Sequence, residues 1–195
     1  MSTNDLLQEL NAIENAKRDN RQRVANIVLD HPELMQSLVD ITFFVQDAIS
    51  IKAAWILEWI CTHHDLNRIL PHLDTFATTI RALQFDGSIR PCAKICEHLA
   101  VSYTRQKEHL VKEHLQLHHI EKIIETGFDW LITPQKIAVR AYTMTTLFLF
   151  GTLKGNEWIH SELEHLIRTK IIHESKGCKA RGKYILEKIG KFKPS

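Results

Sequence analysis

Apolar residues recur three and four positions apart along nearly the whole chain, and no segment sustains an alternation of apolar and polar residues. This spacing is the period of an amphipathic α-helix, whereas a half-buried strand requires alternation. Only seven glycines and five prolines occur among 195 residues, too few for the turns of a β-sandwich or barrel. The sequence therefore predicts an all-α fold of about ten helices. They are expected over residues 4–17, 21–30, 32–44, 49–62, 65–83, 88–103, 106–116, 117–132, 135–153, 156–173 and 178–191.

Local signals set the expected ends of several helices. Asn4 and Asp65 are suitable N-caps, because their side chains can accept a hydrogen bond from a free backbone N–H group. Pro71 is expected to kink the helix over 65–83. The sequence "FDGS" at residues 85–88 predicts a turn before the next helix.

The chain shows no sign of division or of membrane insertion. No segment rich in proline, glycine and serine interrupts it, so we expect a single domain over residues 1–195. The N-terminal sequence has no apolar segment after a basic start, which predicts no secretory signal, and the longest apolar run, residues 143–153, is too short to span a bilayer. We therefore expect a cytoplasmic protein with reduced, buried cysteines, namely Cys61, Cys92, Cys96 and Cys178.

Four segments align with one another by eye. They read "SIKAAWILEWI" at 50–60, "SIRPCAKICEHL" at 88–99, "AVRAYTMTTLFLF" at 138–150 and "GCKARGKYILEKI" at 177–189. Each segment has an aliphatic residue or cysteine directly before a basic residue. Mostly small residues come next, and large apolar residues come last. The basic positions are spaced by 38, 50 and 39 residues, and they are Lys52, Arg90, Arg140 and Lys179.

This pattern resembles the HEAT repeat, in which an outer helix often carries a proline and a turn with aspartate leads to an inner helix that opens with a basic residue. Pro71, Asp86 and Arg90 occupy these places. The resemblance implies an α–α superhelix of antiparallel helix pairs over residues 49–191, because each pair can bury its apolar stripe only against its neighbours. Irregular helices are expected over residues 1–48.

One interval departs from the repeat pattern, and a fold other than the superhelix is compatible with the sequence. The interval of 50 residues between Arg90 and Arg140 exceeds the others and implies an inserted helix near 106–116. An irregular helical bundle is the other fold that this periodicity allows.

Two tryptophans lie four residues apart beside a lysine in the helix expected over 49–62. At helical spacing they fall on a different side from the core stripe, with Glu58 near them. In HEAT-like solenoids this side of the inner helix commonly faces the concave surface, so the resemblance implies a groove that binds a protein or peptide partner. The concave-face candidates are Lys52, Trp55, Trp59, Arg90, Lys94, Arg140 and Thr143. Tryptophans in small helical proteins are also typical packing residues, and the sequence leaves both interpretations open.

The C-terminal segment is strongly basic. Residues 176–195 carry a local charge of +6, whereas the rest of the chain is at −4. The size and general plan are similar to those of HEAT-like DNA alkylation repair proteins, which implies a nucleic-acid binder as the alternative function. Phosphate contacts would then come from Lys179, Arg181 and Lys183. A terminal helix with a solvated lysine face is the simpler interpretation.

The sequence contains no pattern typical of a catalytic or cofactor site. Its glycines are isolated, without a dinucleotide-binding or phosphate-binding loop, and it has no Gly-x-Ser-x-Gly motif. His114 and His118 lie four apart, a spacing that could place them on one helix face, but a zinc site requires a further protein ligand. We therefore expect no metal, no cofactor and no enzymatic activity.

The segment "GSIRPCAK" at residues 87–94 faintly resembles the Gly-Ser-Ser-x-x-Pro-x-Lys loop of the adenylosuccinate lyase and fumarase superfamily. Ile89 stands in place of the second serine, and Pro91 comes early. The histidine motifs of that superfamily have no counterpart in the chain. The sequence does not support a lyase assignment.

Overall fold

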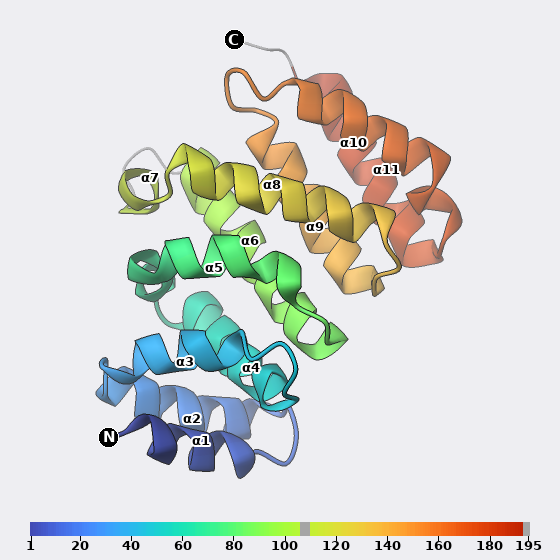
Figure 1. The fold of residues 1–195 in the computed structure, drawn as a ribbon. Helices are drawn as coiled ribbons and strands as arrows, with labels where there is room; N and C mark the ends of the chain where they lie inside the picture. The colour runs from blue at the N-terminus through green and yellow to red at the C-terminus, as the bar shows by residue number, and fades with distance from the viewer. Residues whose placement is uncertain (106–109, 193–195) are drawn as a thin grey trace. The chain divides into compact units, whose positions relative to one another are not determined.

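The structure, a computed structural model, describes residues 1–105 and 110–192. These residues form eleven α-helices and three short 3-10 helices, and they include no strand (Figure 1). The predicted all-α fold is confirmed. In chain order the elements are α1 (Thr3–Asn11), α2 (Arg18–Asp30), α3 (Leu34–Thr42), α4 (Ile49–His63), η1 (Leu66–His72), α5 (Leu73–Thr79), η2 (Ile80–Ala82), α6 (Asp86–Arg105), α7 (Leu110–His114), α8 (Leu117–Ile132), α9 (Ile137–Phe150), α10 (Trp158–Thr169), η3 (Ile171–His173) and α11 (Lys176–Lys191).

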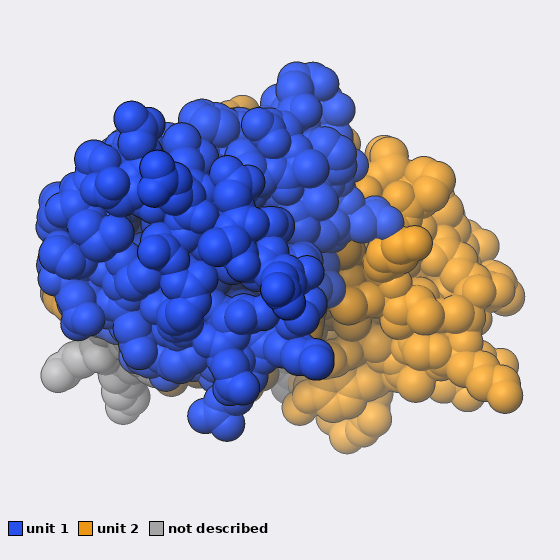
Figure 2. All heavy atoms as spheres, turned by 90° about the horizontal axis from the view of Figure 1, so that it is seen from below, with its two compact units in different colours: residues 1–95 blue, residues 96–195 orange. Residues whose placement is uncertain are grey.

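The chain divides into two compact units, residues 1–95 and residues 96–195 (Figure 2). The boundary falls within α6, so this helix begins in the first unit and continues into the second. Within the described ranges no helix is both long and apolar enough to cross a membrane. The HEAT-like superhelix stays a prediction from the sequence.

In the first unit, most of the other helices pack against α4. Helices α1, α2, α3 and η1 all pack against it. Ala53 and Ala54 are fully buried, and their small side chains let the surrounding helices approach closely. Ile56, Leu57 and Ile60 are also fully buried and form the core stripe expected from the sequence. Because α4 is enclosed in this way, polar side chains on it must find partners inside the protein.

Of the two N-caps expected in the first unit, the structure replaces one and confirms the other. Ser2, not Asn4, caps α1: its Oγ accepts from the backbone N–H of Asp5 at 3.2 Å, and Asp5 Oδ2 accepts from the N–H of Ser2 at 2.8 Å. This reciprocal pair satisfies two backbone donors at once. Asp65 does act as a cap, accepting from the N–H of Asn67 at 2.9 Å. The helix that it was expected to start is broken into η1, α5 and η2, with Pro71 inside η1.

The predicted turn at 85–88 is wrong, because α6 already begins at Asp86. Gly87 serves close packing instead: a Cβ atom there would lie 2.6 Å from Cγ2 of Ile51 on α4. Ser88 is fully buried in the next position and its Oγ lies 3.2 Å from Oγ of Ser50. A glycine and a serine, which are common in turns, here bring two helices together.

In the second unit, α9 packs against α8, α10 and α11. Its buried apolar residues include Val139, Met144, Leu147 and Phe150. Helix α11 approaches its neighbours closely at Gly182, where a Cβ atom would lie 2.9 Å from Cγ2 of Ile167. The helices of this unit therefore enclose an apolar core of their own.

All four cysteines are buried and form no disulfide bond, as the sequence predicted. Burial without a compensating positive charge raises the pKa of the Cys61 and Cys96 thiols well above the usual value, because the thiolate is poorly solvated there. These thiols are therefore poor nucleophiles and act as small apolar side chains.

Candidate functional site

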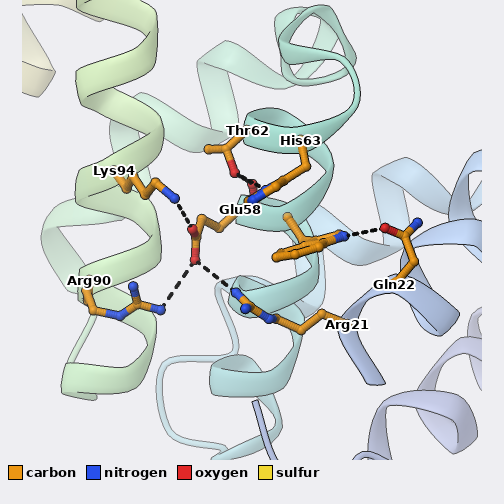
Figure 3. Close-up of polar contacts among 8 residues, drawn as sticks. Arg21, Gln22, Glu58, Thr62, His63, Arg90 and Lys94 are labelled. Atoms are coloured by element: carbon orange, nitrogen blue, oxygen red, sulfur yellow. Dashed lines mark hydrogen bonds and ion pairs between the residues drawn. The ribbon is translucent and has the colours of Figure 1, made fainter. Parts of the chain in front are cut away.

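A buried carboxylate on α4 in the first unit is surrounded by cations (Figure 3). The side chain of Glu58 is 1% exposed. Its Oε1 lies 2.7 Å from Nζ of Lys94, and its Oε2 lies 3.3 Å from Nη2 of Arg90 and 4.0 Å from Nη1 of Arg21. We call these four residues the Glu58 cluster.

The Glu58 cluster is assembled from three helices. Arg90 and Lys94 are four residues apart on α6, which places both on one face of that helix. Arg21 comes from α2, and Glu58 lies on α4 between them. A buried carboxylate requires such partners, since an unpaired charge in this position would be very costly. The cluster therefore joins α2, α4 and α6 of this unit.

The cluster carries more positive than negative charge. Three of its four side chains are cationic and one is anionic, so the formal excess is +2. Its cations also remain partly open to solvent: the side chains of Arg21, Arg90 and Lys94 are 19%, 36% and 23% exposed. A second anion can therefore approach these cations from outside while Glu58 holds them from within.

Trp59 lies beside the cluster and is a packing residue. Its side chain is 5% exposed, and its indole N–H donates to Oε1 of Gln22 at 2.9 Å. The guanidinium carbon of Arg21 lies 4.3 Å from the indole centroid, and the ring of His63 stacks on the indole at 3.7 Å. Of the two interpretations left open by the sequence, packing is therefore the one that holds for Trp59. Trp55 is half-buried.

His63 is a neutral member of this surface rather than a further cation. Loss of solvation lowers its pKa, and the nearby charge of Lys94 lowers it further, although Glu58 partly opposes the shift. Its Nδ1 lies 2.8 Å from Oγ1 of Thr62. The positive charge at this surface thus comes from lysine and arginine and does not depend on histidine protonation.

Lys52 was expected to share a surface with Arg90, but its ammonium group is held elsewhere. Nζ of Lys52 donates to the backbone carbonyl of Asn11 at 2.9 Å, whereas Arg90 contacts Glu58. The two basic residues therefore bind different partners within the first unit.

In the second unit, the structure corrects the expectation that Arg140 and Thr143 line an open groove, because each is only 3% exposed. Nη1 of Arg140 donates to the carbonyl of Leu131 at 2.7 Å, and Nη2 donates to that of Thr133 at 2.9 Å. Its Nε also lies 2.7 Å from Oε2 of Glu174, an ion pair without hydrogen-bond geometry. The guanidinium thus completes the C-terminal end of α8, whose last carbonyls lack helical partners.

The basic residues of α11 fall on two different sides of the helix. Lys179 and Lys183 are exposed and lie four residues apart on one face. Arg181 is half-buried, with Nη1 3.4 Å from Oγ1 of Thr145 and its guanidinium carbon 5.9 Å from the ring centroid of Tyr184. The three candidate phosphate contacts therefore do not form one surface.

The structure does not place the histidine pair on one helix face. Helix α7 ends at His114, and α8 begins at Leu117, so His114 and His118 belong to different helices. Nδ1 of His114 lies 2.9 Å from the carbonyl of Leu110 on its own helix. The segment at 87–94 that resembles the lyase loop is also helical, since it forms the start of α6.

Comparison of the chain with protein-family models, with curated proteins and with solved structures found no match.

Proposed function

We propose that the chain is a non-enzymatic binding module that captures an acidic segment of a partner protein at the Glu58 cluster. The observation that supports this is the excess of two positive charges on partly exposed side chains around a carboxylate that is already buried. Carboxylates of a partner would pair with the solvent-facing sides of Arg90 and Lys94. The four cysteines form no disulfide bond, which is compatible with a reducing compartment, and we propose that the chain acts in the cytoplasm.

Glu58 has a definite role in this proposal. By contacting Lys94 and Arg90 from inside, it holds two long side chains that would otherwise sample many rotamers. Ordering such a side chain on binding costs about 0.5–1.5 kcal/mol, so cations that are ordered beforehand bind an anion more tightly. Charge complementarity of this kind also accelerates association and makes it sensitive to salt.

The test is the affinity for a fluorescent peptide rich in glutamate, measured by fluorescence anisotropy at low ionic strength. We expect Arg90→Gln and Lys94→Gln each to weaken binding about tenfold, which corresponds to the loss of one charge-assisted contact. Lys94→Arg should keep most of the affinity, since it preserves the charge. Lys17→Gln removes an exposed cation of the same unit and is the matched control.

The proposal fails if the wild-type chain does not bind the peptide at low salt. It also fails if Lys17→Gln weakens binding as much as Lys94→Gln does, because binding would then reflect net charge alone. Circular dichroism of each variant confirms that a loss of affinity is not a loss of fold.

Binding of nucleic acid is the second candidate function, and the exposed face of α11 that carries Lys179 and Lys183 favours it. If these lysines contact phosphates, the chain should be retained on heparin and on duplex DNA, and retention should weaken steeply as salt rises. The double variant Lys179→Gln/Lys183→Gln should elute earlier. Absence of retention at low salt would exclude this candidate.

A further inference from the structure

The second unit contains a small cavity whose walls are both cationic and aromatic. Its volume is ≈ 190 Å³, and residues of α6, α9 and α11 line it. The lining residues that matter for its chemistry are Glu97, Arg105, Phe148, Arg181, Tyr184 and Lys188. Neither the Glu58 cluster nor the exposed lysine face of α11 includes any of them.

The cations converge on this cavity because of their spacing on the helices. Arg181 and Lys188 are seven residues apart, which is close to two turns of α11, so they lie on one side of that helix. The guanidinium carbon of Arg181 and Nζ of Lys188 lie 5.9 and 5.4 Å from the ring centroid of Tyr184. Both cations are therefore held near the same aromatic side chain, and Arg105 at the end of α6 adds a third.

We propose that this cavity binds a compact phosphoryl dianion, either inorganic phosphate or the terminal phosphate of a small monoester. Three cations and the single carboxylate of Glu97 line it, an excess of two charges among these side chains. A phosphate group carries about −1.5 to −2 charges at neutral pH and matches this excess. Arginine forks suit the tetrahedral oxygens of phosphate, and lysine supplies a point charge.

The size of the cavity limits what can enter it. Its ≈ 190 Å³ is smaller than the cavities of about 300–1,000 Å³ that drug-sized ligands occupy. A phosphate ion therefore fits with some of its water, whereas a whole nucleotide does not fit inside. Phe148 and Ile185 form apolar walls, beside which charge interactions are less screened than in bulk water.

The experiment is isothermal titration of the full chain with sodium phosphate, with sodium chloride at equal ionic strength as the reference. We expect phosphate, and not chloride, to bind and to raise the melting temperature at concentrations up to about 10 mM. Arg181→Gln and Lys188→Gln should each weaken binding by about ten- to a hundredfold, the loss expected for one charge-assisted hydrogen bond. Lys188 is exposed, so its variant should fold even if that of Arg181 does not.

Two controls keep the outcome interpretable. Lys179→Gln removes the same charge from the other side of α11, and we expect its phosphate affinity to stay within about twofold of wild type, since exposed charges contribute little at a distance. Lys94→Gln, which alters the Glu58 cluster, should not change phosphate binding, so this proposal and the proposed function can fail separately.

A second titration with phosphoserine distinguishes the sources of the phosphate. Binding of both compounds indicates a cavity open to monoesters, whereas binding of inorganic phosphate alone indicates the free ion. The proposal is overturned if neither compound binds, or if Lys179→Gln weakens binding as much as Lys188→Gln does.

Discussion

Neutralising the buried carboxylate of the Glu58 cluster should destabilise the first unit. The Glu58→Gln substitution keeps the shape of the side chain but removes the charge that holds Arg90 and Lys94 at 3.3 and 2.7 Å. Hydrogen bonds to charged groups contribute about 1.5–3 kcal/mol each. Because the cations are 36% and 23% exposed, water replaces part of what they lose, so we use the lower end of this range for the whole cluster. The expected loss in the free energy of unfolding is about 2 kcal/mol.

Urea denaturation followed by far-ultraviolet circular dichroism measures this loss. In a chain of this size, about 2 kcal/mol corresponds to a fall in melting temperature of about 4–8 °C. Glu9→Gln is the matched control, because Glu9 pairs with Arg23 at the surface of the same unit and such pairs contribute about 0.2–1 kcal/mol. If Glu58→Gln costs no more than Glu9→Gln does, the cluster does not join the helices as described.

Arg140→Ala should lower the free energy of unfolding by about 3 kcal/mol, because it removes two hydrogen bonds to backbone carbonyls at a buried position. Lys179→Ala, the exposed control, should change the free energy of unfolding by less than about 0.5 kcal/mol. Equal effects of the two variants in urea denaturation would show that Arg140 is not buried. Burial lowers the pKa of His72, with Asp40 partly opposing it, so the unfolded chain binds more protons and stability should fall as the pH drops below about 6.5. His72→Gln should make the melting temperature less dependent on pH below about 6.5. An unchanged dependence on pH would contradict the lowered pKa of His72. In α11, Gly190→Ala adds a Cβ atom in open space and should stabilise the helix by up to about 1 kcal/mol. Gly182→Ala would place its Cβ atom 2.9 Å from a buried isoleucine and should destabilise the protein. The opposite order of melting temperatures would refute the close packing at Gly182.

The helical content could be predicted because apolar periodicity is a local property of the sequence. The cap at Asp65 was found in the same way, since the residue and the backbone N–H that it accepts from are only two positions apart. The turn predicted around Gly87 was wrong for a different reason. Its glycine is required by the approach of α6 to Ile51, a residue distant in the sequence, and composition cannot distinguish a packing glycine from a turning one.

The Glu58 cluster could not be predicted for the same reason, because its contacts join residues that are distant in the sequence. Spacing on the helix placed Glu58 near Trp59, but only the fold shows that Arg21 from another helix covers the indole and that Glu58 gathers the cations. Aligning the repeat-like segments gave Arg140 the same role as Arg90. Arg140 is buried because the last carbonyls of α8 lie within its reach, a contact that alignment of basic residues does not reveal.

We propose that the cations around Glu58 form a surface for an acidic partner. Nuclear magnetic resonance of the guanidinium and ammonium groups during titration with the glutamate-rich peptide tests it most directly. We predict that the side-chain signals of Arg90 and Lys94 shift first and saturate together, while those of Lys179 and Lys183 stay in place. Shifts confined to the α11 lysines, or no shifts at low salt, would contradict it.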